Sequence, residues 1–350
     1  MIAKDLVQIT PTLPPVFNGL GDYADLLGSA LGARGRPGRY VVTDTTWSGT
    51  RPDAVRLAAR TPEALVAALA ESEAVVLHYV NYAYDPQRGW PLWLIDGLTQ
   101  ARALRPQMRL AVCFHETWAF GPPWRKAFWF MPRQRQCALH LARLAQQVWT
   151  SNGHYARRVD GLRAPDAARC VVMPVCSNVG EPVAPPPYAQ RAPRLVCFGR
   201  PGNRVRAYRN GAAALARLCA AHGITGIDDV GAPIPAPDLP VIAGVTVTAH
   251  GALASSRISE LLSAARFGLI DNGTGRLAKS GVFAAYASHG CAPVVETDYP
   301  DEDGVATGRT CISLPHGHAD PAQVAATALA WYRGHGTAAL ADMVGGFLGT

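Results

Sequence analysis

Two glycines near the start of the chain stand in a pattern that can bind phosphate. Residues 18–24 read NGLGDYA, so Gly19, Gly21 and Ala24 fit the G-x-G-x-x-A fingerprint of dinucleotide sites. In that fingerprint the first glycine comes directly after a strand. Here eight residues, three of them proline, separate Thr10 from Gly19, and this spacing argues against a dinucleotide. A helix start with glycines can still bind a phosphate, and simple shaping of the turn is the competing interpretation.

Polar side chains follow two of the expected strands. His115 and Glu116 end one apolar run, and His78 and Asn81 end another. Because ligands of parallel sheets bind beyond the carboxyl ends of the strands, these residues are candidates for a site. A histidine beside a carboxylate suits acid–base chemistry, so His115 and Glu116 are the catalytic candidates, and His78 and Asn81 the acceptor contacts. Packing or ion pairing is the alternative interpretation for each of them.

The segment 118–136 interleaves aromatic and cationic side chains. Three tryptophans and three phenylalanines alternate there with arginines and a lysine. Such a mixture suits a membrane interface or a lipid-diphosphate acceptor, and Trp118 and Trp124 are the expected acceptor contacts. A packed loop with solvated charges is the alternative.

No residues have the spacing of a metal site. The eight cysteines are scattered without a C-x-x-C pair, so buried thiols are expected. The D-x-D of Asp301 and Asp303 comes so late in the chain that a solvated acidic loop is expected. His316 and His318 lack a third ligand. We therefore expect no metal and no cofactor.

The elements that must position these residues alternate between strand and helix. Short apolar runs separated by helical patterns predict parallel sheets covered on both faces. The proline-rich segment 181–193 predicts a linker, because the alternation restarts after it. We therefore predict an α/β fold of two doubly wound Rossmann-like domains, 1–180 and 194–320, facing each other across a cleft. A last helical region, 321–350, is expected to run back across the first domain. The expected strands are 6–10, 39–44, 74–80, 109–115, 147–151, 194–199, 241–247, 267–271 and 292–297.

Composition restricts the location and the partners. Hydrophobic residues make up 49% of the chain, yet no stretch approaches the ~20 apolar residues of a membrane span. The N-terminus lacks the apolar region of a secretory signal, so a cytoplasmic protein is expected. The net charge of +7 suits an anionic membrane surface or a phosphorylated substrate. Nucleic acid is not expected, because no RNA-binding aromatic motif, helix-turn-helix pattern or lysine-rich tail occurs.

Several segments occur in a characteristic order along the chain. They are FNGLGDYADLLGSAL (17–31), FHETWAFGPPW (114–124), VWTSNGHYARRV (148–159), CFGRPGNRVR (197–206) and SSRISELLSAARFGLIDNGTGRLAKSGVFAAYASHGCAPVV (255–295). This order resembles the GT-B glycosyltransferases, nearest the large retaining group called family 4, which builds bacterial polysaccharides and lipid-linked glycans. The resemblance covers most of the chain.

The resemblance implies roles for individual residues. His115 would face the transferred sugar. Helix starts and cationic side chains would stabilise the departing diphosphate in place of a bound metal. The diphosphate contacts that carry over are Gly19, Gly21, Gly199, Arg200, Arg204, Lys279, Ser280 and Gly281.

One departure from the family leaves the donor and the stereochemistry open. The family carries two glutamates seven residues apart ahead of the segment matched by HGCAPVV, whereas residues 275–290 here contain no acid. We predict a glycosyltransferase that moves a hexose from a UDP- or GDP-sugar to a hydroxyl of a glycan or lipid-linked acceptor. The alternatives are a sugar-nucleotide epimerase of the same fold, a non-catalytic partner of another transferase and, last, a dinucleotide oxidoreductase.

Overall fold

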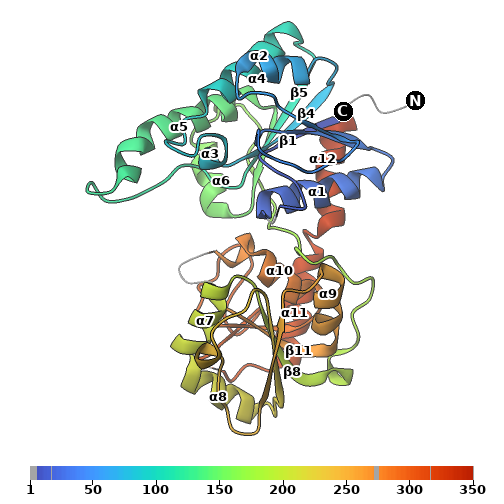
Figure 1. Cartoon of the computed structure of the whole chain (residues 1–350), viewed down its shortest axis with the longest axis vertical. Coiled ribbons are helices and arrows are strands. Elements are labelled where there is room, and N and C mark those ends of the chain that lie inside the picture. The colour runs from blue at the N-terminus through green and yellow to red at the C-terminus, as the bar shows by residue number, and fades with distance from the viewer. Residues whose placement is uncertain (1–5, 17, 272–275, 316, 350) are drawn as a thin grey trace. The chain divides into compact units, whose positions relative to one another are not determined.

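The chain divides into two compact units. The computed structural model describes residues 6–16, 18–271, 276–315 and 317–349. The first unit is Met1–Met173 with Leu340–Thr350, and the second is Pro174–Ala339 (Figure 1). The division after Met173 therefore precedes the proline-rich segment 181–193, which lies within the second unit. Each unit is a parallel sheet with helices between its strands.

The first unit is built on a seven-stranded sheet. Its strand order is β3-β2-β1-β4-β5-β6-β7, and every neighbouring pair is parallel. The strands are β1 (Leu6–Thr10), β2 (Gly38–Val42), β3 (Ala54–Arg56), β4 (Ala74–Tyr79), β5 (Arg109–Phe114), β6 (Gln147–Thr150) and β7 (Val171–Val172). The helices are α1 (Gly19–Gly32), α2 (Pro62–Ala68), α3 (Asn81–Tyr84), α4 (Leu92–Leu104), α5 (Lys126–Leu144), α6 (Gly153–Asp160) and α12 (Thr337–Gly349).

The two faces of this sheet differ in chemistry because successive strand residues point to opposite sides. One face is an apolar core with α2, α4 and α5, and it includes Val7, Ile9, Val75, Leu77, Val112 and Phe114. The alternate positions on the same strands carry Gln8, His78 and Cys113. These face the side of α1, whose Tyr23 contacts His78. The sheet therefore has an apolar face and a partly polar one.

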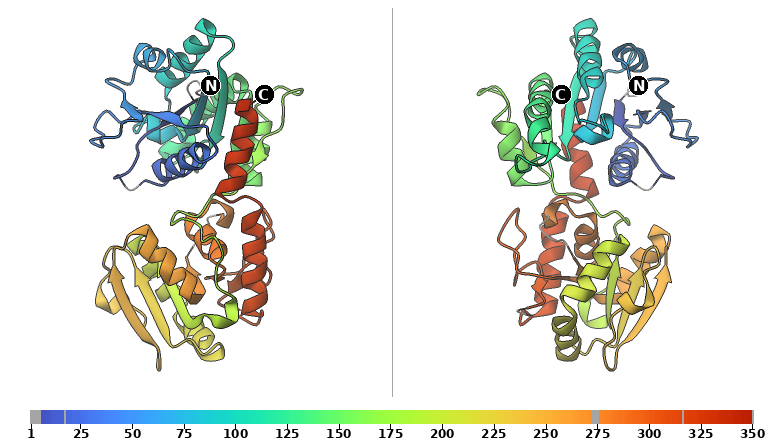
Figure 2. Two further views of the ribbon diagram at one scale, coloured as in Figure 1. Left: turned by 90° about the vertical axis from the view of Figure 1, so that its right-hand side faces the viewer. Right: turned by 60° about the vertical axis from the view of Figure 1, so that its left-hand side comes forward.

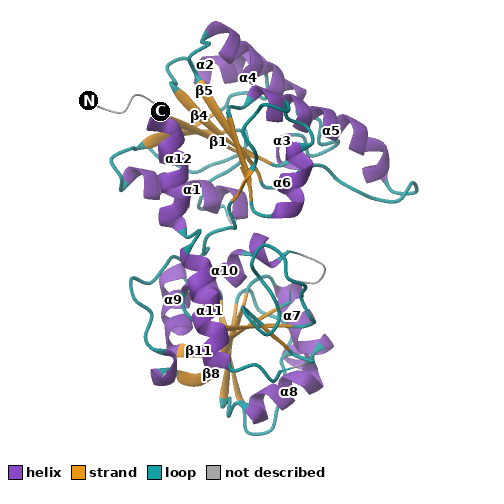
Figure 3. Cartoon of the chain, turned by 180° about the vertical axis from the view of Figure 1, so that it is seen from behind, coloured by secondary structure: helices purple, strands orange, loops and turns teal. Residues whose placement is uncertain are grey.

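The second unit repeats the same strand pattern. Its sheet order is β10-β9-β8-β11-β12-β13, again with parallel pairs throughout. Figure 3 shows this sheet in orange with purple helices around it. The strands are β8 (Ala192–Phe198), β9 (Gly226–Val230), β10 (Thr246–Gly251), β11 (Ala265–Ile270), β12 (Ala292–Val295) and β13 (Ile312–Ser313). The α-helices are α7 (Pro201–Asn210), α8 (Ala212–Ala221), α9 (Ser255–Ala264), α10 (Gly281–Ser288) and α11 (Pro321–Arg333), and the 3-10 helices are Tyr188–Gln190, Ala236–Asp238 and Leu277–Lys279.

The C-terminal region contains two helices where the sequence predicts one. The first of them, α11, packs on the second unit, with Ala328 and Tyr332 against α10. The other, α12, belongs to the first unit from Leu340 onward and lies beside its sheet (Figure 2). The Phe347 carbonyl accepts a hydrogen bond of 2.8 Å from Arg109 at the start of β5. Among the described residues, no helix is long and apolar enough to cross a membrane.

Gly21 is required by close packing, whereas Gly19 is not. A Cβ on Gly21 would lie 2.6 Å from the carbonyl oxygen of Thr12, and one on Gly19 would meet nothing within 4 Å. We predict that Gly21→Ala lowers the free energy of unfolding by about 1–3 kcal/mol through overpacking. Gly19→Ala should leave it unchanged or raise it by about 0.5 kcal/mol. Urea denaturation of both variants measures this, and equal stabilities would contradict it.

Candidate active site

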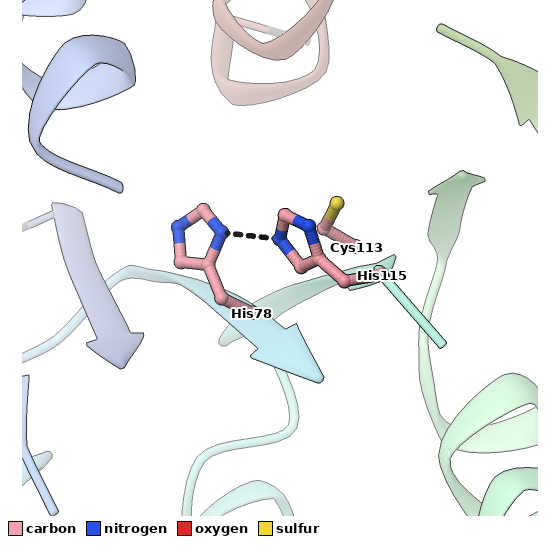
Figure 4. A group of neighbouring side chains, drawn as sticks. All are labelled: His78, Cys113 and His115. Atoms are coloured by element: carbon pink, nitrogen blue, oxygen red, sulfur yellow. Dashed lines mark hydrogen bonds between the residues drawn. The ribbon is translucent and has the colours of Figure 1, made fainter. Parts of the chain in front are cut away.

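His78 and His115 come together at the carboxyl edge of the first sheet. His78 pairs directly with Cys113 across β4 and β5, and His115 comes two residues later on the same face. The Nδ1 atom of His78 lies 3.3 Å from Nε2 of His115 (Figure 4). Both side chains are buried, with His78 fully inaccessible. The structure thus brings together two residues that the sequence analysis assigns to separate roles.

A third residue, Gln8, determines which histidine nitrogens carry protons. Its Oε1 lies 2.8 Å from Nε2 of His78, so that nitrogen is the donor. Nδ1 of His78 is then an acceptor, and Nε2–H of His115 donates to it. The lone pair of His115 is left on Nδ1. Burial lowers the pKa of His78 to about 3, which keeps its ring neutral near pH 7.

The histidine pair is also held by an aromatic side chain of α1. The ring of Tyr23 lies edge-on to His115, with centroids 4.8 Å apart. Nε1–H of Trp149, on β6, donates to the Tyr23 hydroxyl at 3.3 Å. The helix that starts at Gly19 therefore contacts the histidines. Sequence reasoning missed Gln8, Tyr23, Cys113 and Trp149, because only strand register and helix placement reveal them.

The two neighbouring candidates, Glu116 and Asn81, differ in accessibility. Glu116 is exposed just beyond His115. Asn81 is buried at the start of α3, and its Nδ2 has no hydrogen-bond partner among the described residues. A carboxylate at the surface can exchange protons with solvent, whereas the buried amide of Asn81 cannot.

The aromatic and basic segment is partly helical. The sequence favours a loop up to about residue 132, but α5 begins at Lys126 and continues through Pro132 to Leu144. Trp118 is half-buried, and the guanidinium of Arg158 stacks 3.8 Å from its ring centroid. Trp124 is 82% exposed. The two predicted acceptor contacts thus occupy different environments.

In the second unit, most of the predicted phosphate contacts lie at one edge of the sheet. Gly199 follows β8 with φ +132°, and a Cβ on it would lie 3.8 Å from Val282 in the first turn of α10. Ser280 caps that helix, its Oγ accepting from the N–H of Phe283 at 3.2 Å. Other first-turn N–H groups and the helix dipole favour an anion there. Lys279 is half-buried just ahead of the helix, and Arg200 is exposed at the start of α7.

Arg204 is the exception among these residues. Its side chain is 1% exposed and forms an ion pair with Asp229. Nε–H of Arg204 donates to the carbonyl of Gly199 at 3.1 Å, and a terminal nitrogen donates to the carbonyl of Ala232. The Tyr208 hydroxyl also donates to Asp229, at 2.8 Å. Because its guanidinium is engaged inside the unit, we reassign Arg204 from contacting a phosphate to holding the Gly199 loop.

Two acids stand at this edge although residues 275–290 contain none. Asp271 directly follows β11, and Glu296 directly follows β12. Nε–H of Arg206 donates to Asp271 at 2.6 Å. Burial raises the pKa of Glu296, and the neighbouring Asp271 raises it further. Sequence reasoning missed both acids because they lie outside the segment where the family places its glutamates.

For the cysteines and the late acidic segment the sequence predicts no site. All eight cysteines are buried, as predicted. Asp301 is exposed and pairs with Arg309 at 2.9 Å, as a solvated acidic loop would be. His316 lies outside the described residues.

Solved structures with a similar fold are known, although the sequences differ. No protein-family model and no curated protein sequence matches the chain. HepE from Anabaena, solved with UDP and glucose, is 12% identical with a TM-score of 0.63, covering 99% of this chain and 100% of that one. An alpha-glucosyltransferase solved with UDP is 9% identical with a TM-score of 0.56, covering 99% and 100%. A structure described as a UDP-N-acetylglucosamine 2-epimerase from Listeria monocytogenes is 12% identical with a TM-score of 0.59, covering 97% and 94%.

These similarities extend over nearly the whole chain but at low identity, so they show the fold alone. The predicted α/β architecture of two Rossmann-like units, as in GT-B glycosyltransferases, is confirmed. The narrower resemblance to family 4 stays a prediction.

Arg204 and Arg200 should differ sharply in what they contribute to stability. Arg204→Ala leaves the Asp229 carboxylate buried without its cation, which costs about 3–5 kcal/mol of unfolding free energy. Arg200→Ala, at an exposed site four residues earlier, should change it by no more than about 0.5 kcal/mol. Chemical denaturation followed by circular dichroism measures both. If Arg204→Ala is as stable as the unmodified protein, the structural role is wrong and Arg204 is again a candidate phosphate contact.

Proposed function

We propose that this protein is a glycosyltransferase that moves a hexose from a UDP- or GDP-sugar to a hydroxyl of a glycan or lipid-linked acceptor. The observation that carries the proposal is the edge of the second sheet, where Gly199 and Arg200 lie beside the start of α10. Similar folds solved with UDP support it. The narrower placement in family 4 rests on the ordered sequence segments.

The chemistry needs stabilisation of a departing diphosphate. The start of α10 offers backbone N–H groups and the positive end of the helix dipole. Lys279 and Arg200 add positive charge, Ser280 is the N-cap of α10, and Gly281 is the first residue of that helix. Such fixed donors stabilise charge that develops in the transition state without a metal ion. Gly19 and Gly21, at the start of α1, are proposed as further diphosphate contacts.

On the acceptor side we assign the reacting groups to the first unit. When Nε2–H of His115 donates to His78, the lone pair on Nδ1 of His115 can accept a hydrogen bond. Exposed Glu116 is the proposed base toward the acceptor hydroxyl. The proposed acceptor contacts are His78, Asn81, Trp118 and Trp124.

A specific observation supports a second candidate, a sugar-nucleotide epimerase. Such an enzyme needs carboxyl groups to move protons, and Asp271 and Glu296 lie together with a raised pKa at Glu296. The Listeria structure has the same fold. NMR of UDP-N-acetylglucosamine incubated with the protein distinguishes the candidates, because an epimerase changes the sugar without an acceptor. Nucleotide binding without any turnover would favour a non-catalytic partner.

We predict that UDP or GDP binds and that Lys279→Ala and Arg200→Ala each weaken the affinity about tenfold. Loss of one charge-assisted phosphate contact costs about 1.5 kcal/mol, which is roughly that factor. Isothermal titration measures Kd, with ADP and NAD as comparison ligands. Arg257→Ala, an exposed residue of α9 paired with Glu260, is the matched control and should bind normally. Failure of every nucleoside diphosphate to bind would overturn the transferase proposal.

We further propose that the protein works at the cytoplasmic face of an anionic membrane. Trp124 and Trp129 are 82% and 68% exposed, and Arg125 and Lys126 are exposed between them. Tryptophans enter the headgroup region while the cations attract anionic lipid. No nucleic-acid partner is proposed.

Vesicles containing phosphatidylserine should bind the protein, and neutral vesicles should not. Arg125→Ala and Lys126→Ala should each weaken partitioning about fivefold, since a surface cation contributes about 1 kcal/mol. Leu104→Ser, at an exposed apolar position on α4 of the same unit, is the control and should partition as the unmodified protein does. Flotation at increasing salt measures this, and binding that does not fall with salt would argue against electrostatic attachment.

A further inference from the structure

We propose that His78, Cys113 and His115 form a binding site for a thiophilic divalent cation of the zinc class. One ligand atom from each residue lies within 4.8 Å of the other two, and all three residues are buried (Figure 4). Imidazole nitrogen and thiolate sulfur are the ligands that zinc prefers. Among the described residues, no other three metal-ligating side chains approach one another as closely. This proposal goes beyond the transferase function and gives His78 and His115 a second role, in which Nδ1 of His115 donates a hydrogen bond instead of accepting one.

The site is built on rigid elements. His78 and Cys113 are direct partners in the register of β4 and β5, and His115 extends β5 by one residue. Alternation along the strands puts all three on the face opposite the apolar core. Ligands fixed on neighbouring strands lose little freedom when they bind a metal.

The separation of the two histidine nitrogens suits a tetrahedral ion. Zinc–nitrogen bonds of about 2.0–2.1 Å in tetrahedral geometry place two nitrogens roughly 3.3–3.4 Å apart. Nδ1 of His78 and Nε2 of His115 are 3.3 Å apart. The thiol of Cys113 supplies the third ligand on the same side of the sheet. Three protein ligands leave the fourth position of such an ion open.

Gln8 orients the first histidine for this role. Its Oε1 accepts the Nε2–H of His78 at 2.8 Å, which leaves the lone pair on Nδ1. Metal-bound histidines are held in this way by a hydrogen-bond acceptor on the far nitrogen.

Binding changes the protonation of the other two ligands in a balanced way. Cys113 gives up its thiol proton to solvent and binds as the thiolate. The proton on Nε2 of His115 is replaced by the metal, while a proton is taken up on Nδ1, so the number of protons on this ring does not change. One proton is released overall, and the His78–His115 hydrogen bond is replaced by two metal–nitrogen bonds.

The test is a Co²⁺ titration of the full-length, reduced protein after treatment with a chelator. We expect one ion per chain with the charge-transfer absorption of a cobalt–thiolate bond, and displacement of that ion by Zn²⁺. Cys113→Ser should abolish the absorption. Cys137→Ser, which changes another buried cysteine of the same unit, is the matched control and should keep it. Gln8→Leu should weaken Co²⁺ binding about 10- to 100-fold, because the hydrogen bond that orients His78 is lost.

Absence of the cobalt–thiolate absorption in the unmodified protein, or its persistence in Cys113→Ser, would overturn the proposal. Should Cys113→Ser fail to fold, NMR of the unmodified protein with ¹⁵N-labelled histidine gives the answer. Zn²⁺ should shift Nδ1 of His78 and Nε2 of His115, and unchanged resonances of those two nitrogens would show that they keep their hydrogen bond. Neither readout needs transferase activity, so the two proposals can fail separately.

Discussion

Parallel pairing of every strand decides where chemistry can occur in this chain. When all neighbouring strands are parallel, their carboxyl ends lie at one edge of the sheet. Between two central strands the strand order reverses, and ligands of such sheets bind at this switch point. In the first sheet those strands are β1 and β4, and His78 lies at the end of β4. In the second they are β8 and β11, followed by Gly199 and Asp271. The candidate residues of each unit therefore gather where topology alone would put a ligand.

In the second unit a buried ion pair positions that edge. Arg204 and Asp229 are almost completely inaccessible, and removal of two charges from water is costly unless all their polar atoms are satisfied. Arg204 meets this requirement by donating to backbone carbonyls as well, including that of Gly199. Gly231 completes the arrangement, since a Cβ there would lie 2.5 Å from the Gly199 oxygen. The Gly199 loop is therefore held in place by contacts within the unit, and it does not need a bound phosphate to take up this position.

The sequence predicts most of the fold because apolar runs mark the buried strands, but it fails where burial depends on partners. Strand β9 reads GIDDV and carries two acids, so no hydropathy pattern reveals it. Asp228 is buried because Arg194 and His250 bind it on one face, and Asp229 because Arg204 binds it on the other. The strand expected over 241–247 lies later, at β10. Strand ends could be read from the sequence, which is why His78 and His115 were found.

The polar face of the first sheet is harder to explain by folding alone. Gln8, His78 and Cys113 occupy strand positions whose neighbours on the other face are core residues: Val7, Ile9, Leu77, Tyr79, Val112 and Phe114. A buried polar network at best matches the stability of well-packed apolar residues in the same space, because each member must first lose its water. The hydrogen bonds among Gln8, His78 and His115 offset that cost, but they do not make the fold more stable than apolar residues would. A chemical role for the imidazoles accounts for what packing does not, whether they bind a sugar hydroxyl or a metal ion.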